Sequence, residues 1–255
     1  MNDAVGRFSN RVDNYVKYRP RYPEGVIDTL RSDCGLTPGS LIADVGSGTG
    51  FLTELFLRNG NTVWAVEPNA DMRAAAELML ADAAGFRSVS GMAEATTLPD
   101  HSVDIVAAGQ AFHWFDRDRT RLEFGRILKP GGWVALIWNE RETQSTPFLR
   151  AYEELLQRFA TDYAQVDHRL IDDAVLSDFF NPGVFHLQTF PNRQVFDFAG
   201  VQGRLLSSSY APEQGQPGHE PMLAELRRIF DAHNENDRVS FDYLTRVYYG
   251  QLPPR

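Results

Sequence analysis

The sequence predicts an α/β protein in which helices cover both faces of a mostly parallel sheet. Three observations lead to this fold class: short apolar segments recur along the chain, segments with helical periodicity separate them, and turns containing Gly or Pro join the two kinds. The chain has 255 residues, of which 43% are hydrophobic, so it is long enough to bury one full core. We therefore expect a single domain over residues 1–255, completed by a cap.

Five strands and the helices between them are expected in the first part of the chain. The apolar segments that predict the strands occupy residues 41–45, 62–66, 86–90, 103–108 and 133–138. Helical spacing predicts helices that begin at Pro23 and at Phe51, a third that follows Asn69 as its N-cap, and a fourth that ends near Leu128. Residues 129–132 are expected to form a turn before the fifth strand.

The pattern changes after residue 138. Later segments are expected to form helices over 140 to about 180, a strand near 184–190, a helix near 200–207, a loop over 212–221, a helix over 222–233 and a closing strand over 240–252. The two later strands bring the expected sheet to seven. The helices after the fifth strand are expected to form a cap or insertion.

Charge and composition argue against several kinds of partner. The formal net charge is −9 and like charges form no block, so attraction to nucleic acid or to an anionic membrane is not expected. No apolar run approaches the roughly 20 residues that cross a bilayer, and the first residues lack the apolar core of a signal peptide. The single cysteine, Cys34, can form no internal disulfide and adjoins no set of metal ligands. We therefore expect a cytoplasmic protein without a metal site.

A glycine-rich loop follows the first expected strand. Gly46, Gly48 and Gly50 alternate with other residues between that strand and a helix, which is typical of a nucleotide-binding βαβ unit. The spacing is G-x-G-x-G, and Phe51 stands where a dinucleotide fingerprint places its last glycine. Asp44 precedes the loop and would repel a pyrophosphate, which favours a cationic or zwitterionic ligand.

A second carboxylate, Glu67, lies about 20 residues after the loop, at the end of the second strand. It can accept hydrogen bonds from both ribose hydroxyls of a nucleotide. Dinucleotides and other adenosine ligands share this feature, so it does not discriminate between them.

Four strings between about residues 40 and 138 resemble those of class I S-adenosylmethionine-dependent methyltransferases, of the small-molecule group called type 11. The strings are DVGSGTG (44–50), VEPN (66–69), GMAEATTLPDHSVDIV (91–106) and RILKPGGW (126–133). Residues 18–23 and 111–116 are similar to a narrower, trans-aconitate methyltransferase-like subset. The resemblance implies a Rossmann-like fold with S-adenosylmethionine as cofactor. Residues of about 36–138 would form the cofactor-binding half, and residues 1–35 and 139–235 the cap and the substrate-side elements.

The resemblance also implies roles for residues of the loop and of the second strand. Gly46, Ser47 and Gly48 would approach the methionine part of the cofactor. Asp44 would lie near its ammonium group or an ordered water, and Glu67 would hold the ribose.

Further cofactor contacts are implied downstream. Asn69 and Met72 would flank the adenine, Ala93 and Glu94 would lie at the edge of the ring, and Gln110 would pass beside the donor methyl. Two of these residues also have an ordinary structural explanation, because Met72 could be core and Glu94 could favour a helix start.

Two N-terminal residues, Tyr15 and Arg19, could close over the cofactor, with Arg19 pairing with its carboxylate. They could equally be surface residues of an N-terminal arm. On the substrate side, Arg19, Arg21 and Arg141 could bind an acidic acceptor or remain solvated. Other pocket positions are chosen by their place after strands or in the variable region, namely Trp138, Tyr210 and Tyr248.

The segment His113-Trp114-Phe115-Asp116 begins just beyond the fourth strand, where parallel sheets place their sites. His113 could act as a general base during methyl transfer, and Trp114 could wall the pocket. The aromatic residues could instead be core, and Asp116 is well placed to cap a helix. Transfer to an ionised carboxylate needs no base.

The expected function is methyl transfer to a small-molecule acceptor, such as a carboxylate or a hydroxyl, by in-line displacement. The resemblance does not select the atom that is methylated, and the oligomeric state stays open. Two alternatives are an NAD-dependent oxidoreductase, which Phe51 and Asp44 disfavour, and a protein that binds the cofactor without transfer.

Overall fold

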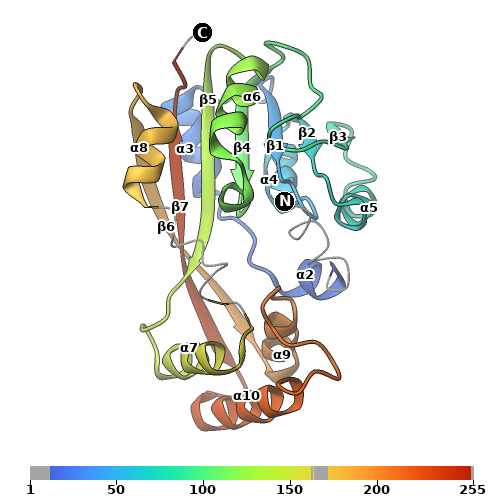
Figure 1. Cartoon of the computed structure of the whole chain (residues 1–255), viewed down its shortest axis with the longest axis vertical. Helices are drawn as coiled ribbons and strands as arrows, with labels where there is room; N and C mark the ends of the chain where they lie inside the picture. Colours follow the sequence, from blue (N-terminus) through green and yellow to red (C-terminus); the bar gives the residue numbers. More distant parts are fainter. Residues whose placement is uncertain (1–11, 162, 164–171, 254–255) are drawn as a thin grey trace.

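The computed structural model describes residues 12–161, 163 and 172–253. The molecule has an upper part built on a sheet and a lower part built mainly of helices, and the long strands β5, β6 and β7 run from one part into the other (Figure 1).

The sheet has seven strands in the order β3-β2-β1-β4-β5-β7-β6. Their bounds are Leu41–Val45 (β1), Thr62–Val66 (β2), Phe86–Val89 (β3), Val103–Gly109 (β4), Leu128–Arg141 (β5), Phe185–Phe196 (β6) and Val239–Gly250 (β7). Strands β1 to β5 pair in parallel, and β7 is antiparallel to both of its neighbours. The mostly parallel Rossmann-like sheet of the prediction is confirmed.

The helices have these bounds: α2 Val12–Tyr18, α3 Gly25–Cys34, α4 Phe51–Arg58, α5 Ala70–Met79, α6 Arg117–Ile127, α7 Pro147–Phe159, α8 Asp173–Phe180, α9 Phe198–Leu206 and α10 His219–His233. A short 3-10 helix, η2, spans Phe112–Trp114. Asn69 caps α5 as predicted, because its side chain accepts from two backbone N–H groups of the first turn.

Residues 129–132 differ from the prediction. They do not form a separate turn but continue β5, whose pairing with β4 shifts register between Val103 and Ile105. A β-bulge absorbs the extra residues here, and Gly131 supplies the left-handed conformation with φ +78°.

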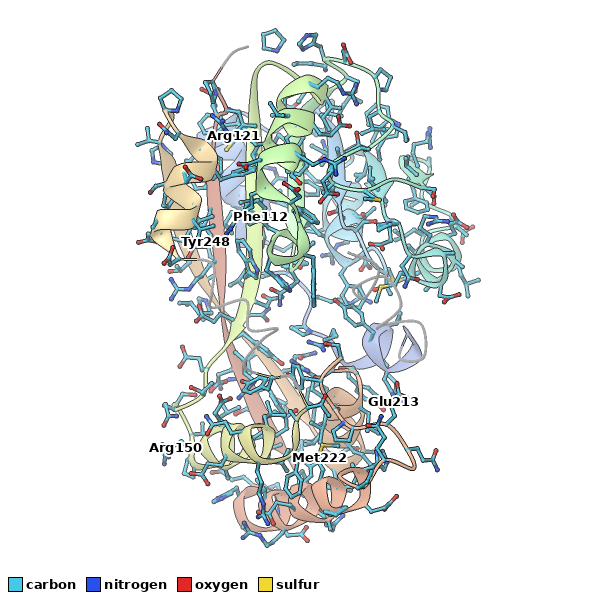
Figure 2. All side chains as sticks on the ribbon, in the orientation of Figure 1. Phe112, Arg121, Arg150, Glu213, Met222 and Tyr248 are labelled. Carbon is cyan, nitrogen blue, oxygen red and sulfur yellow. The ribbon has the colours of Figure 1, made fainter. Side chains whose placement is uncertain are left out.

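Helices cover both faces of the sheet. Leu30 of α3 and Phe56 of α4 pack on one face, and Phe124 of α6 and Phe180 of α8 pack on the other. The strands between them are apolar on both faces, as a parallel sheet between two helical layers requires. Figure 2 places Phe112 in this upper part.

The lower part is the cap. Helices α7, α9 and α10 share a separate apolar core with the first half of β7, and Met222 lies among them (Figure 2). The predicted helical cap after the fifth strand is therefore present, with strand segments added to it. Helix α8, expected with the helical region, does not belong to the cap: its buried face, around Phe180, packs on the sheet instead.

Helix α2 lies between the two parts (Figure 1) and contacts α9 of the cap. None of the helices in the described ranges is long and apolar enough to cross a membrane.

Candidate functional site

A pocket of about 420 Å³ lies where the carboxyl ends of the parallel strands face the cap. Its walls include the loop after β1 and the residues after β4, which are neighbours in the sheet although β2 and β3 separate them in the chain. The direction of the strand order reverses between β1 and β4. In open α/β sheets this reversal is where ligands bind.

The loop after β1 requires glycine at Gly46, because two constraints act there. Its φ is +69°, and an added Cβ would lie 2.6 Å from the Cβ of Ala111. The N–H of Gly46 donates to the carbonyl of Val66 at 2.8 Å, which holds the loop against β2. Glycine thereby lets the loop pack directly on Ala111, and the loop in this conformation lines the pocket.

Glu67 is oriented by the same loop. One carboxylate oxygen accepts from the Gly48 N–H at 2.9 Å, and the other accepts from the Asn69 N–H at 2.8 Å. Burial raises the pKa of Glu67, although the two backbone hydrogen bonds oppose the shift. Each oxygen keeps acceptor capacity, so the carboxylate can hold ligand hydroxyls in a fixed position.

Asp44 is the second-last residue of β1, just before the loop, and it is fully buried. Its Oδ2 accepts from the Thr53 hydroxyl at 2.6 Å, whereas Oδ1 has no partner among the described residues. Burial raises the pKa of Asp44 to about 7, against the hydrogen bond from Thr53. A buried carboxylate oxygen that lines a pocket and lacks a donor is suited to a cationic ligand group.

Gln110 follows β4 and has φ +56°, an uncommon conformation for a residue with a side chain. Its Nε2 donates to the carbonyl of Asn139 at 3.2 Å, and its buried Oε1 has no partner within the described ranges. Gln110 therefore presents a second buried acceptor to the pocket.

Asn139 lines the pocket, but its side chain forms hydrogen bonds with other residues of the protein. Its Nδ2 contacts the carbonyls of Pro20 and Arg21, and its Oδ1 accepts from Thr245 at 2.6 Å and from Asn192 at 3.1 Å. One side chain thus joins the N-terminal segment to β5, β6 and β7.

The expected adenine-side residues line the same pocket. The Met72 side chain lies beside Gly48: a Cβ added to Gly48 would be 3.4 Å from the Met72 Sδ. Asn69 is held by its capping of α5, and Oε1 of Glu94 accepts from the Asp116 N–H at 2.8 Å. Glu94 thereby fixes the start of α6, which agrees with its structural explanation, and it also lines the pocket. Ala93 is buried beside it.

His113 and Trp114 belong to η2, and their rings lie 4.8 Å apart between centroids. Both line the pocket, whereas their neighbour Phe112 is core. Asp116 caps α6 through a hydrogen bond from the Arg119 N–H, as the sequence suggested. Neighbouring residues of this segment therefore have three different places: in the core, at the N-cap of α6 and in the pocket wall.

The N-terminal helix covers one side of the pocket. The Tyr15 ring stacks on Phe51 at 6.1 Å, and the guanidinium carbon of Arg19 lies 5.2 Å from the Tyr15 ring centroid. Arg19 also donates to the carbonyl of Ser207 at 3.0 Å and to the Ser208 hydroxyl at 3.3 Å. Neither residue belongs to a free surface arm, because both line the pocket.

Arg141 and Tyr210 line the pocket on the cap side, together with Tyr163. Arg141 pairs with Glu153 of α7 and donates to the Tyr163 hydroxyl at 3.1 Å. Burial raises the pKa of Tyr210, but the charges of Arg204, Arg19 and Arg141 outweigh burial and lower it below its usual value.

Three predicted substrate residues, Trp138, Tyr248 and Arg21, lie elsewhere; Tyr248 belongs to the core around Trp138. Trp138 is core: its side chain points to the α8 face of the sheet, with its ring 6.2 Å from Phe112 and 5.8 Å from Tyr248. Side chains alternate along β5, so Asn139 and Arg141 face the pocket side while Trp138 faces away. Arg21 is half exposed, pairs with Glu54 and covers the Phe51 ring, so it is a surface residue outside the pocket.

Sequence reasoning missed Arg204 and Tyr22, which both line the pocket. Arg204 is 5% exposed and donates to the Tyr243 hydroxyl at 3.2 Å. A lone arginine within the apolar segment of α9 was the available signal. Tyr22 lies in the segment 18–23 that carries the narrower resemblance, but nothing local indicates its position, because its hydroxyl fills the space that a side chain at Gly109, far away in the sequence, would need.

Comparisons with known proteins agree with this geometry. A family model described as a methyltransferase domain matches residues 43–136. An uncharacterized methyltransferase of Schizosaccharomyces pombe is 33% identical over 252 residues, which cover 98% of this chain and 99% of the relative. An uncharacterized methyltransferase of Mycobacterium tuberculosis is 34% identical over 151 residues, or 59% of each chain.

A solved structure supports the fold. A putative type II methyltransferase from Anaeromyxobacter dehalogenans superposes with a TM-score of 0.69 at 21% identity and covers 93% of this chain and 100% of its own. The sequence relatives and the family model favour methyl transfer over the dinucleotide-dependent alternative. The chain belongs to the class I methyltransferases that use S-adenosylmethionine as cofactor.

Proposed function

We propose that this methyltransferase acts on a small molecule, which binds between the cofactor and the cap and offers an oxygen nucleophile, a carboxylate or a hydroxyl. The observation that carries the proposal is the pocket itself. Buried acceptor atoms without protein donors face it from the sheet, and cationic side chains face it from the cap side. We further propose that residues 1–255 act as one domain, with residues of about 36–138 as the cofactor-binding half.

The residues present fit the cofactor. The methionine part of S-adenosylmethionine carries an ammonium group, and Oδ1 of Asp44 is a buried acceptor without a donor. Gly46, whose missing Cβ lets the loop pack directly on Ala111, lines the pocket beside Ser47 and Gly48. Glu67, fixed by two backbone N–H groups, is positioned to hold the ribose hydroxyls.

Other contacts follow from the lining of the pocket. Ser47 and Gly48 would complete the wall beside the methionine part, and Gln110 would offer Oε1 there. Asn69, Met72, Ala93 and Glu94 would surround the adenine, and Tyr15 and Arg19 would close the pocket.

The chain's own residues have two tasks in the transfer. When bound, S-adenosylmethionine supplies a methyl group on a sulfonium; a lone pair of the acceptor bonds to the methyl carbon, and the pair of the broken carbon–sulfur bond stays on sulfur. The pocket must hold the acceptor in line with that bond and exclude water. Trp114 and Tyr210 are placed to form its walls.

His113 would accept the proton if the acceptor is a hydroxyl, and it would have no proton to move if the acceptor is a carboxylate. The pH profile of the His113→Asn variant separates these cases. For a carboxylate acceptor we expect the variant to keep the pH profile of kcat. For a hydroxyl acceptor we expect its kcat to fall by at least about 100-fold.

Titration calorimetry with S-adenosylhomocysteine, followed by a crystal structure of that complex, tests the proposal. We expect binding at the loop after β1 and a residual cavity beside the sulfur bounded by His113, Trp114 and Tyr210. A complex in which the cap side chains close completely over the sulfur, leaving no space for an acceptor, would contradict a small-molecule substrate at this site.

A further inference from the structure

The cap-side end of the pocket concentrates positive charge. Arg19 of the segment after α2, Arg141 of β5 and Arg204 of α9 all line it, although they are far apart in the sequence. Tyr210 lines the same pocket, and the charges of the three arginines outweigh burial and lower the pKa of its hydroxyl. The chain as a whole has a net charge of −9, so this end of the pocket is opposite in sign to the protein.

These charges are incompletely compensated. Arg141 pairs with Glu153, whereas no carboxylate of the described ranges pairs with Arg19 or Arg204. Tyrosine and serine hydroxyls surround the cluster instead, from Tyr152, Tyr163, Ser208, Tyr210 and Tyr243. Glu140 also lines the pocket, but its carboxylate pairs with Arg246. Burial and the like charge of Arg204 lower the pKa of Arg19, whereas the neighbouring tyrosine hydroxyls outweigh burial and raise the pKa of Arg204.

Two buried N–H groups of the cluster also lack partners. Nη1 of Arg141 and Nε of Arg19 make no hydrogen bond to any residue that the structure describes. The Arg141 side chain is 10% exposed, so water compensates little of this loss. A buried cationic donor without an acceptor is costly in a structure that serves stability alone. It is favourable where an anionic ligand completes the site.

We propose that Arg141 and Arg204 form an anion subsite that holds a carboxylate of the methyl acceptor, so that the acceptor is an anionic small molecule anchored from the cap side. This inference rests on the proposed function. Guanidinium groups match a carboxylate with paired N–H donors, which accounts for arginine rather than lysine at both positions. Arg19, which reaches over Tyr15, is left for the carboxylate of the cofactor.

The anchored carboxylate and the methylated atom need not be the same. An arginine that neutralises the attacking oxygen would weaken it as a nucleophile. The subsite therefore favours acceptors with two polar ends, one held by the arginines and one presented to the donor methyl. In a dicarboxylate both ends are alike, and in a hydroxy acid the hydroxyl is the reacting end.

The test uses the full-length protein, acetate as the probe and acetamide as its neutral match. Calorimetry and thermal unfolding at constant ionic strength measure acetate binding with and without saturating S-adenosylhomocysteine. We expect acetate to bind saturably to the S-adenosylhomocysteine complex and acetamide not to bind. Binding that S-adenosylhomocysteine abolishes would assign the subsite to the cofactor's carboxylate and overturn the proposal.

Variants locate the probe. In Arg204→Gln and Arg141→Gln we expect acetate affinity to fall at least about tenfold while S-adenosylhomocysteine affinity stays within about twofold. Arg204→Lys and Arg141→Lys keep the positive charge and are controls for misfolding of the glutamine variants. They should bind acetate more weakly than the wild-type protein. Arg227→Gln, on the exposed side of α10, is the matched control and should change neither affinity.

Two further outcomes separate this inference from the proposed function. Normal S-adenosylhomocysteine binding without saturable acetate binding in wild type would overturn the anion subsite alone. Loss of S-adenosylhomocysteine binding in wild type would overturn the assigned cofactor pocket, and both proposals with it.

Discussion

The two ends of the pocket carry opposite charge and are built in opposite ways. The sheet end holds Asp44 and Glu67, which lie in one loop-and-strand unit and are fixed by neighbouring backbone N–H groups and by Thr53. The cap end holds Arg141 and Arg204, which come from a strand and a distant helix and meet through side chains. A ligand site made of local backbone is similar in many proteins, whereas one assembled from remote side chains is particular to this chain.

The largest effect is expected at the bare backbone of the sheet end. Gly46→Ala should weaken S-adenosylhomocysteine binding by about 100-fold or more, because its φ of +69° is unfavourable for alanine and the new methyl would lie 2.6 Å from Ala111. Calorimetry measures the loss. Gly131→Ala is the matched control: its φ is +78° but nothing lies within 4 Å, so stability should fall slightly and affinity should not.

A loop that tolerates Gly46→Ala with affinity within about threefold of wild type would show that the cofactor does not approach this backbone. The contrast between the two ends of the pocket would then lose its basis.

The next effect concerns Glu67. Glu67→Ala removes a carboxylate that is fixed by two N–H groups and leaves those donors without a partner, so S-adenosylhomocysteine should bind more than about tenfold more weakly. Glu77→Ala removes an exposed carboxylate on α5 and should leave the affinity unchanged. Equal affinities of both variants would remove Glu67 from the site.

A pH effect is expected from Asp44. Its folded-state pKa, raised by burial to about 7, lies above the ordinary value of 3.8, so the protonated side chain stabilises the unliganded fold below about pH 4. This stabilisation is lost as the pH rises from about 4 to about 7, by up to about 4 kcal/mol. Denaturant unfolding at each pH measures it.

Asp44→Asn should reduce this slope by the Asp44 contribution, since the amide does not titrate, and leave that of Glu67, whereas the exposed Asp28→Asn should retain the whole slope. Parallel stability curves for wild type and Asp44→Asn across this range would contradict the assignment. The liganded protein should behave differently, because a cationic group at Oδ1 favours the ionised carboxylate.

The smallest effect is expected at Trp138, which belongs to neither end. Trp138→Phe keeps the ring contacts with Phe112 and Tyr248 and removes an Nε1 donor without a partner among the described residues. The free energy of unfolding should change by about 1 kcal/mol, and binding of S-adenosylhomocysteine and of acetate should not change. A change in either affinity would return Trp138 to the pocket.

The sheet end could be predicted from the sequence because its signals are local. All of them lie between residues 41 and 67: the apolar segment, the alternating glycines and Glu67. Their spacing predicts a strand, a glycine turn, a helix and a second strand. The cofactor positions were implied by the family resemblance that starts from this unit, and all of those expected line the pocket.

The cap end could not be predicted in the same way. Arg204 enters the pocket because α9 packs beside α2 and β7, and no short-range pattern encodes that packing. Trp138 was misplaced because its position after apolar residues did not reveal which face of β5 it occupies. Alternation along a strand separates two faces but does not say which of them the ligand meets.

The place of β7 has a consequence for biosynthesis. Among the described residues this strand follows all the others in sequence, yet it lies between β5 and β6, and β6 pairs with no other described strand. While the chain emerges from the ribosome, β5 has an open edge and β6 has no position on the sheet until residues 239–250 are made. Both the Asn139 junction with Thr245 and the Tyr243 contact of Arg204 must wait for the same event. The nascent protein therefore exposes an aggregation-prone strand edge until residues 239–250 are made, and the acceptor side of the pocket cannot form before then.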